Sequence, residues 1–238
     1  MGKISKAKLL EASLHHAGIQ LRDTSKRGFT RATTAGLDQG LQQVFSQLFR
    51  DLGGLEESNG AFTAGDWDLA DDHGMYLEFD EDTHFHRYRR QTLNLPWSAQ
   101  LPWTNDYRRY CIDFESKARV FGGYWTGEAA ERQFGPAAAR RDFTGNGGPR
   151  WKQRALYDAV RDAVALHTEG IGLIRVSIHD RIDGVPLGKL LKPGKPLAPQ
   201  QLRKLIAHRT IPVGTIAADT TPVGTTDQPH PRAAMSLV

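Results

Sequence analysis

The chain has 238 residues, of which 39% are hydrophobic and 24% are charged, and its formal net charge is +4. This composition predicts one globular domain of ordinary size, and the lack of about 18 consecutive apolar residues excludes a transmembrane helix. The first residues lack the apolar core of a secretory signal, and the single cysteine, Cys111, excludes an internal disulfide. We therefore expect a cytoplasmic protein with no membrane partner, in which Cys111 is a small core residue.

Charge is unevenly distributed along the chain. Basic residues outnumber acids in the segments 140–161 and 183–210, whereas carboxylates are concentrated between Asp51 and Asp82. A metal-dependent phosphodiesterase needs both kinds of segment, because cations hold a nucleic-acid backbone and carboxylates hold the ion. Ordinary patchiness of a protein surface is the alternative explanation.

Two amphipathic helices are predicted in the N-terminal part. Residues 5–17 place leucines on one side of a helix that Gly18 closes. Residues 36–51 repeat apolar side chains at i, i+4 and i+7, the spacing of a helix that faces a core, and the pair Gly53-Gly54 ends it.

A β-hairpin is predicted in the acidic segment. Residues 66–70 and 75–80 alternate polar and apolar side chains, and the intervening sequence DDHG is typical of a turn. Because successive side chains of a strand point to opposite faces, Glu78 and Asp80 share one face. The neighbouring antiparallel strand can bring Asp68 beside them.

An aromatic-rich insert over about residues 94–150 follows the hairpin. Helices are expected from about Thr104 to Phe114 and after Thr126, and the glycine-rich loop 142–150 lacks the GxxxxGK(S/T) pattern of a phosphate loop. The large aromatic side chains of the insert can stack on bases or form its core, and we favour the core. They are Trp97, Trp103, Tyr107, Tyr110, Tyr124 and Trp125.

The C-terminal half supplies the remaining regular elements. A strong helix is predicted at residues 151–167, a strand at 172–178 and a short helix near 199–208. The order of elements predicts an α/β domain over residues 1–214, with a mixed central sheet flanked by helices. Residues 215–238 are poor in large apolar side chains and predict a disordered tail.

Three carboxylates of the hairpin, Asp68, Glu78 and Asp80, are the candidate ligands of a hard divalent cation, Mg²⁺ or Mn²⁺. Like charges at close range raise one another's pKa, and a bound ion removes that repulsion and stabilises charge on a scissile phosphate. His84, just past the strand, can ligate the metal, contact phosphate or act as a general acid or base. A solvated turn paired by salt bridges is the alternative for these residues.

Cations near these acids are the candidate contacts to nucleic-acid phosphates. They are Arg87, Arg90, Lys152, Arg154 and Arg175. Arg175 lies between apolar neighbours on a predicted strand, and a buried arginine needs a carboxylate partner, for which Asp68 or Glu78 is the candidate.

The acidic hairpin resembles the PD-(D/E)XK restriction-endonuclease-like superfamily, and in particular its very-short-patch-repair-like branch of small nucleases. In that branch an aspartate strand precedes an apolar strand that ends E-x-D-G-x-x-H. Asp68, Glu78-x-Asp80 and His84 are similar to this pattern in order and spacing.

The second part of the resemblance lies further along the chain. The branch continues with a helix that carries Asp and Arg, then a glycine and a strand with an inward arginine. Asp158, Arg161, Gly170 and Arg175 follow that order here. The resemblance implies a restriction-endonuclease-like fold and a catalytic set of Asp68, Glu78, Asp80 and His84. It also implies Mg²⁺-dependent endonuclease activity on DNA.

Two departures from the branch weaken the expectation of cleavage. Glu81 occupies the position of the glycine after the second acid, and Asp80 occupies the position of the usual lysine. His84, Lys152 or Arg154 can replace that lysine. A catalytically inactive nucleic-acid-binding or protein-interaction domain of the same fold is the alternative function.

Overall fold

A mixed sheet of five strands forms the centre of the structure, a computed structural model that describes residues 4–24, 29–56, 58–120 and 125–215. In their order across the sheet, the strands are β1 (Arg22–Asp23), β2 (Leu69–Ala70), β3 (Met75–Asp80), β4 (Gly172–Ser177) and β7 (Thr210–Ile211). Strands β3 and β4 are parallel, and the other neighbouring pairs are antiparallel. The expected α/β class with a mixed central sheet is therefore confirmed.

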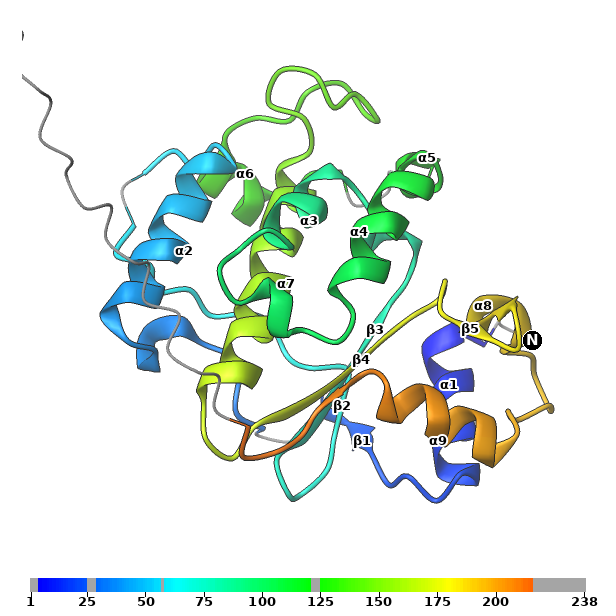
Figure 1. Cartoon of the computed structure of the whole chain (residues 1–238). Helices are drawn as coiled ribbons and strands as arrows, with labels where there is room; N and C mark the ends of the chain where they lie inside the picture. Colours follow the sequence, from blue (N-terminus) through cyan, green and yellow to red (C-terminus); the bar gives the residue numbers. More distant parts are fainter. Residues whose placement is uncertain (1–3, 25–28, 57, 121–124, 216–238) are drawn as a thin grey trace, which may run out of the picture.

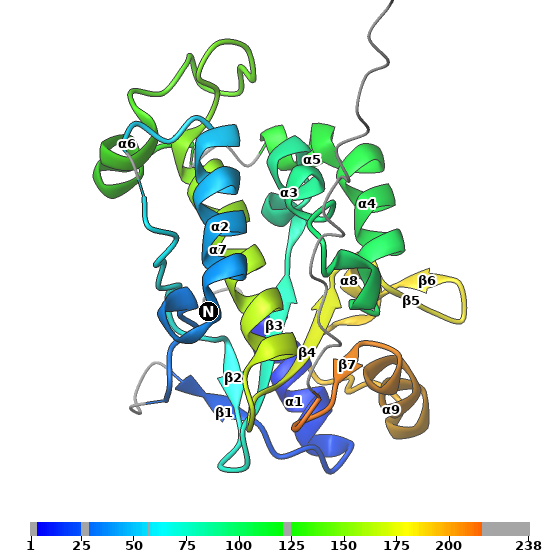
Figure 2. The same ribbon diagram turned by 60° about the vertical axis from the view of Figure 1, so that its left-hand side comes forward.

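Helices cover both faces of the sheet. The α-helices are α1 (Lys6–His16), α2 (Gln39–Asp51), α3 (Arg87–Thr92), α4 (Thr104–Asp113), α5 (Glu115–Val120), α6 (Glu128–Phe134), α7 (Pro149–His167), α8 (Leu187–Leu190) and α9 (Pro199–Ala207). Short elements are the 3₁₀ turns η2 (Thr34–Gly36), η3 (Asp82–His84) and η4 (Ser98–Gln100) and the β-ribbon of β5 (Arg181–Ile182) and β6 (Val185–Pro186). Figures 1 and 2 show α2, α3, α4 and α7 on one side of the sheet and α1 and α9 on the other.

Most of the expected elements are present. The helices expected at residues 5–17, 36–51, 151–167 and 199–208 are confirmed as α1, α2, α7 and α9, with ends that differ by a few residues. The hairpin is β2 and β3, although β2 contains only two residues. The short helices α3, α5 and α8 are additions that no clear apolar period predicts.

Strand β3 separates two hydrophobic cores. Leu77 and Phe79 face a core built with α1 and α9, whereas Tyr76 faces a larger core built with α2, α4 and α7. Glu78 and Asp80 share the face of Tyr76, as the alternation of a strand requires. The acidic face of β3 therefore lies under α7, in the interior of the protein.

A glycine contact aligns the two parallel strands. Gly74, in the turn before β3, has φ +88, and a Cβ there would lie 2.0 Å from the carbonyl oxygen of Gly170. The carbonyl of Gly74 accepts a hydrogen bond of 2.9 Å from the Gly172 amide at the start of β4. This close approach fixes the register that places Glu78 opposite Arg175.

The insert between β3 and α7 packs mainly into the larger of the two cores. The helices expected from about Thr104 and after Thr126 are confirmed as α4 and α6. All five described aromatic residues of the set are buried, as expected, but only Trp125 belongs to a separate small cluster. The other four, Trp97, Trp103, Tyr107 and Tyr110, belong to the larger core. Tyr124 and the expected tail beyond Thr215 lie outside the described residues.

None of the described helices combines the length with the apolar character that crossing a membrane requires.

Candidate functional site

Charged side chains meet between the sheet and helix α7, at the end where β3 and β4 both terminate. Strand β3 contributes Glu78 and Asp80, and the parallel strand β4 contributes Arg175 opposite Glu78. Asp158 and Asp162 lie one turn apart on the buried face of α7. All but Glu78 are at most 1% exposed, and Glu78 is 5% exposed.

Asp80, His84 and Asp158 form the centre of the cluster. The Nδ1 atom of His84 lies 3.0 Å from Oδ1 of Asp80 and 3.0 Å from Oδ2 of Asp158. One candidate ligand atom from each residue lies within 4.8 Å of the others. The turn η3 makes this possible, because it reverses the chain directly after β3 and returns His84 to the end of the strand.

Buried arginines compensate the carboxylates. Nη1 of Arg175 lies 2.9 Å from Oδ2 of Asp80 and 3.4 Å from Oδ1 of Asp158, and its Nε lies 3.1 Å from Asp162. Arg89 on α3 adds a contact of 2.8 Å to Asp162. The partner expected for Arg175 was wrong, because Asp80, and not Asp68 or Glu78, pairs with its guanidinium group.

Burial and ion pairing act in opposite directions on these acids. Burial alone would raise the pKa of Asp158, but His84 and Arg175 hold that pKa well below its usual range. Burial raises the pKa of Glu78 to about 8, although Arg161 on α7 approaches Glu78 Oε1 at 3.1 Å. Like-charge repulsion is thus relieved by arginines and by a proton, so the cluster does not require a cation to exist.

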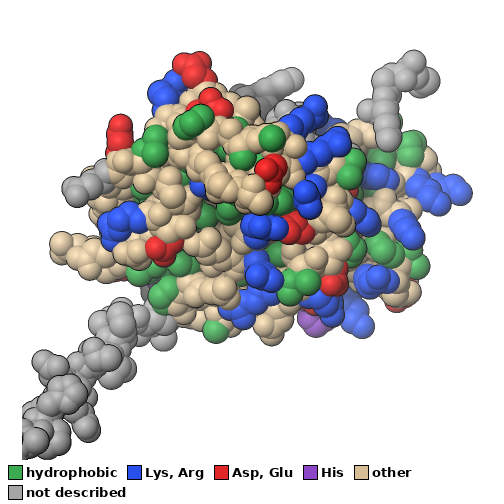
Figure 3. Space-filling model, turned by 90° about the horizontal axis from the view of Figure 1, so that it is seen from above, with side chains coloured by type: hydrophobic (Ala, Val, Ile, Leu, Met, Phe, Trp, Pro, Cys, Tyr) green, Lys and Arg blue, Asp and Glu red, His purple; other side chains and the backbone are tan. Residues whose placement is uncertain are grey.

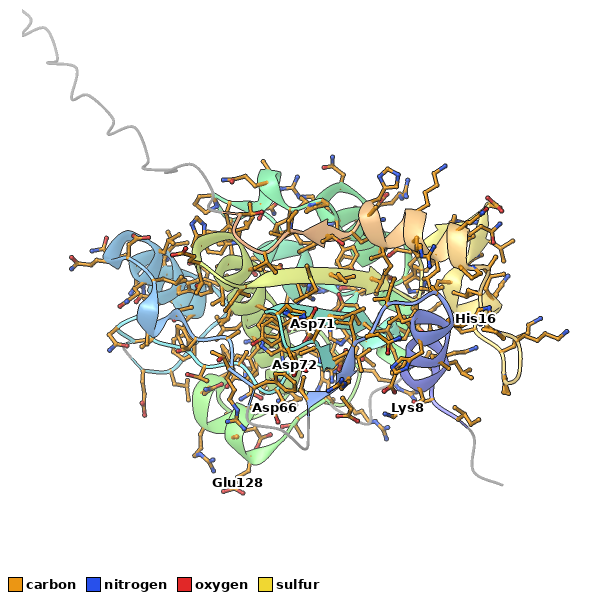
Figure 4. The ribbon with its side chains drawn as sticks, turned by 90° about the horizontal axis from the view of Figure 1, so that it is seen from below. Lys8, His16, Asp66, Asp71, Asp72 and Glu128 are labelled. Carbon is orange, nitrogen blue, oxygen red and sulfur yellow. The ribbon has the colours of Figure 1, made fainter. Side chains whose placement is uncertain are left out.

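Asp68 lies at the open side of this cluster. Its Oδ2 accepts a hydrogen bond of 2.8 Å from the Phe79 amide, which attaches the segment before β2 to β3. Desolvation raises the pKa of Asp68, and the nearby Asp80 adds to that shift, although the residue keeps an exposed surface. Asp66, labelled in Figure 4, instead pairs with Arg31 at 2.9 Å on the surface.

A cleft of about 350 Å³ leads from solvent to the cluster. Its acidic side is formed by Asp68, Glu78, Glu81, His84 and Asp158, and its basic side by Arg150, Arg154 and Arg161, with Tyr157 between them on α7. We call this hollow the acidic cleft. Asp80 lies just beneath its floor, fully buried.

The candidate phosphate contacts lie in different places. Arg154 lines the acidic cleft and donates a hydrogen bond to the Thr83 hydroxyl. Arg175 is completely buried, and Lys152 is buried with its amino group 2.7 Å from Asn146 Oδ1, so neither presents a cation to a surface ligand. The expectation of a phosphate contact is therefore wrong for these two residues.

Two further candidates, Arg87 and Arg90, lie on α3. Both are exposed, and neither is among the described residues that line the acidic cleft. Arg87 forms a bidentate salt bridge with the carboxylate of Glu115, with distances of 3.0 Å from Nε and 2.9 Å from Nη2.

Helix α7 supplies residues that the candidate set omitted. Asp158 and Arg161 entered through the family resemblance, and Asp162 and Arg150 were assigned no role in the site. A signal was present, because Asp158 and Asp162 occur at i, i+4 within an otherwise apolar helix face. Buried acids at that spacing indicate cationic partners from another element.

The donor set fits a divalent cation. His84 Nδ1 lies 3.0 Å from each aspartate, which is the length of a direct hydrogen bond or ion pair and also roughly the separation of two donor atoms that share an octahedral ion at about 2.1 Å. Two carboxylates and an imidazole suit Mn²⁺ and similar ions, whereas Mg²⁺ prefers oxygen alone. Asp68 and Glu78, expected as ligands, line the adjoining cleft and are not part of this three-residue set.

Fold and site together define an α/β protein with a buried cluster of acids, arginines and one histidine between a mixed sheet and helix α7. The chain belongs to DUF7255, a family of unknown function, whose family model matches residues 47–193. The matched region includes every residue from Asp68 to Arg175 that forms the cluster. Searches of curated proteins and of solved structures found no match.

Proposed function

We propose that this protein is a metal-dependent endonuclease that hydrolyses phosphodiester bonds in DNA. The observation that supports the proposal is the convergence of Asp80, His84 and Asp158, with ligand atoms within 4.8 Å, at a cleft with three arginines. Carboxylates and imidazole hold an ion, and arginines hold phosphate, so both halves of a phosphodiesterase site are side by side.

Each side chain has a distinct role in this proposal. Asp80, His84 and Asp158 would hold the ion, which supplies an activated water and polarises the scissile phosphate. Arg150, Arg154 and Arg161 orient the phosphate, because their guanidinium groups offer paired donors to its oxygens. Burial raises the pKa of Glu78 to about 8, which favours its protonated form, and that form can donate a hydrogen bond to a phosphate oxygen.

We propose a restriction-endonuclease-like fold for this protein. The acid-bearing hairpin, the helix with Asp158 and Arg161, and the strand with Arg175 occur in the order that the resemblance requires. They also pack against one another as one unit, which sequence order alone does not guarantee. A cytoplasmic setting remains part of the proposal, in keeping with the buried, unpaired thiol of Cys111.

A plasmid-nicking assay tests the proposal. Wild type is incubated with supercoiled plasmid and Mn²⁺, Mg²⁺ or EDTA, beside Asp80→Asn, His84→Ala and the exposed control Asp51→Asn. Wild type and the control should nick in Mn²⁺, less so in Mg²⁺ and not in EDTA, and the two site variants should lose about 100-fold or more. Equal nicking by wild type and Asp80→Asn would assign the activity to a contaminant.

A catalytically silent nucleic-acid-binding or protein-interaction domain is the second candidate. It is favoured by one observation, namely that Arg161 and Arg175 already compensate the acids. Calorimetric titration with Mn²⁺ separates the two candidates. A heat of Mn²⁺ binding that wild type shows and His84→Ala lacks supports the nuclease. The absence of any heat of binding in wild type supports the silent domain.

A further inference from the structure

A second cleft lies beside the acidic one, across the turn η3. Its volume is about 660 Å³, and it opens where β4 ends and the chain passes into the ribbon β5–β6 and helix α8. Asp82 at the start of η3 lines this second cleft, and His84 at the end of η3 lines the acidic cleft. The two hollows are therefore separated by a single three-residue turn.

The second cleft, which we call the basic cleft, has cations around its rim. Four exposed cations line it against two carboxylates, Asp82 and Asp113. The cations are Arg109 on α4, Lys117 on α5, Arg181 on β5 and Lys189 on α8. This excess of positive charge favours an anionic ligand.

Aromatic rings support two of these cations. The Lys117 amino group lies 4.7 Å from the centre of the Phe114 ring, and the Arg109 guanidinium lies 5.7 Å from that of Tyr110. Arg109 also contacts Asp106 at 2.8 Å, but Arg109 is exposed and Asp106 keeps a second partner, Arg209, at 2.6 Å, so Arg109 can exchange this contact for a ligand. The rings restrict the side chains, while the charged groups stay at the surface.

The floor of the basic cleft is already formed. The His179 ring, 7% exposed, stacks on Phe114 with centroids 3.7 Å apart, and its Nε2 lies 3.1 Å from Asp82 Oδ1. The Gly188 amide donates a hydrogen bond of 2.9 Å to the carbonyl of Ile178, which attaches α8 to the segment after β4. A Cβ at Gly188 would lie 2.3 Å from Ile178 Cγ1, so this wall tolerates no side chain there.

Positive charge extends beyond the cleft on the same side of the molecule. Figure 3, which looks down on Figure 1, shows Lys and Arg side chains more numerous on the half that carries α4, α5 and α8 than on the half that carries α2. A polyanion longer than the cleft therefore meets further cations at this end of the protein.

We infer that the basic cleft binds backbone phosphates of the DNA strand whose scissile phosphate occupies the acidic cleft. The identity of the polymer rests on the proposed function, and the site itself rests on the four cations and on the shared turn η3. A strand that leaves the acidic cleft over η3 enters the basic cleft directly. Binding there neutralises phosphates and releases counterions, so it holds the strand without reading its sequence.

Fluorescence anisotropy with a labelled DNA duplex in EDTA tests the inference, because binding is then measured without cleavage. The charge-reversal variant is Lys117→Glu/Arg181→Glu. Its matched control is Arg50→Glu/Arg132→Glu, which makes the same change of charge at exposed positions on α2 and α6, far from α8 in Figures 1 and 2.

Wild type and control should bind alike, and the cleft variant should bind about 10- to 100-fold more weakly at moderate salt. The slope of log K against log salt should also fall by about 1.8, from two phosphates at about 0.9 each. Equal weakening in both variants, no weakening in either, or no binding by wild type would each overturn the inference. Equal loss of binding to a polyglutamate peptide would also overturn it, in favour of an acidic protein ligand.

Failure of the nuclease proposal and failure of the basic-cleft inference give different results in these assays. If plasmid stays intact in Mn²⁺ while the cleft variant alone loses DNA binding, cleavage is refuted and the basic cleft is retained. If wild type nicks plasmid and the cleft variant binds DNA as wild type does, the nuclease is retained and the basic cleft is refuted.

Discussion

Arg175 on β4 directs one guanidinium nitrogen, Nη1, at both carboxylate oxygens of Asp80 on the parallel strand β3, at 2.9 and 3.2 Å. Both residues are completely buried. The pair therefore joins the two strands at the point where the candidate metal ligands meet. In this interior position the guanidinium carries the compensating charge that the sequence analysis assigned to a metal ion.

Replacing Arg175 by Met should destabilise the protein by about 3–5 kcal/mol, because Asp80 and Asp162 lose their common partner inside the protein. The exposed pair of Arg87 and Glu115 provides the control, and Arg87→Met should cost at most about 1 kcal/mol. Urea unfolding followed by circular dichroism measures both. Mn²⁺ should stabilise Arg175→Met more than wild type, because an ion can replace the lost cation. Equal losses in the two variants would contradict the compensating role of Arg175.

Two neighbouring aspartates allow a matched test of the acidic cleft. Asp68→Asn should lower nicking in Mn²⁺ at least about 10-fold, because Asp68 lines the cleft, whereas Asp66→Asn should leave it unchanged. Both variants should keep their stability within about 1 kcal/mol, since the side-chain amide oxygen that Asp68→Asn introduces can still accept from the Phe79 amide. Loss of activity in Asp66→Asn alone would place the chemistry elsewhere.

His86 should make the stability depend on acidic pH. Burial, followed by the charges of Arg154 and His84, holds the pKa of His86 well below its usual value near 6.5, so the unfolded chain takes up its proton first. Stability is then fully present above about pH 6.5 and falls as the pH drops below that value. His86→Asn keeps an acceptor for the Arg89 amide and should remove that part of the slope. Urea unfolding of wild type and His86→Asn at pH 7.5 and 5.5 measures the loss of stability on acidification. An equal loss in the two proteins would contradict the prediction.

Cys111 should be inert in the folded protein. It is 3% exposed, and burial raises the pKa of its thiol to about 12, so thiolate is scarce at pH 8 and access is blocked. Reaction with a thiol-specific disulfide reagent should be at least about 100-fold slower than for the same chain in denaturant. Rapid reaction of the folded protein would show that α4 opens readily.

Alanine substitutions at Gly74 and Gly170 distinguish the cost of backbone strain from the cost of a steric clash. Both have positive φ, but only at Gly74 would a Cβ collide with backbone, since nothing lies within 4 Å of a Cβ at Gly170. Gly170→Ala should cost about 1–2 kcal/mol, and Gly74→Ala clearly more, because β3 and β4 must separate. Thermal unfolding of the two variants measures this difference. Equal melting temperatures would contradict the proposed register contact.

The sequence determined the local structure well. The apolar period of α1, α2, α7 and α9 and the alternation in β3 were sufficient to predict these elements, because each pattern reports one buried face of one element. The same alternation placed Glu78 and Asp80 correctly on a common face. It could not reveal the two-residue strands β1 and β7, because two residues carry no period and their pairing partners lie far away in the chain.

For the site, the sequence determined which acids and which histidine lie near the hairpin, and that aromatic residues would fill the insert. Only the tertiary structure decided that α7 brings Asp158 to Asp80 and His84, and that Arg175 and Lys152 are buried and not presented to a ligand. The reason is physical. Strand alternation and helical period fix the face on which a side chain lies, but the partner of a buried charge is chosen by elements that pack together from distant parts of the chain.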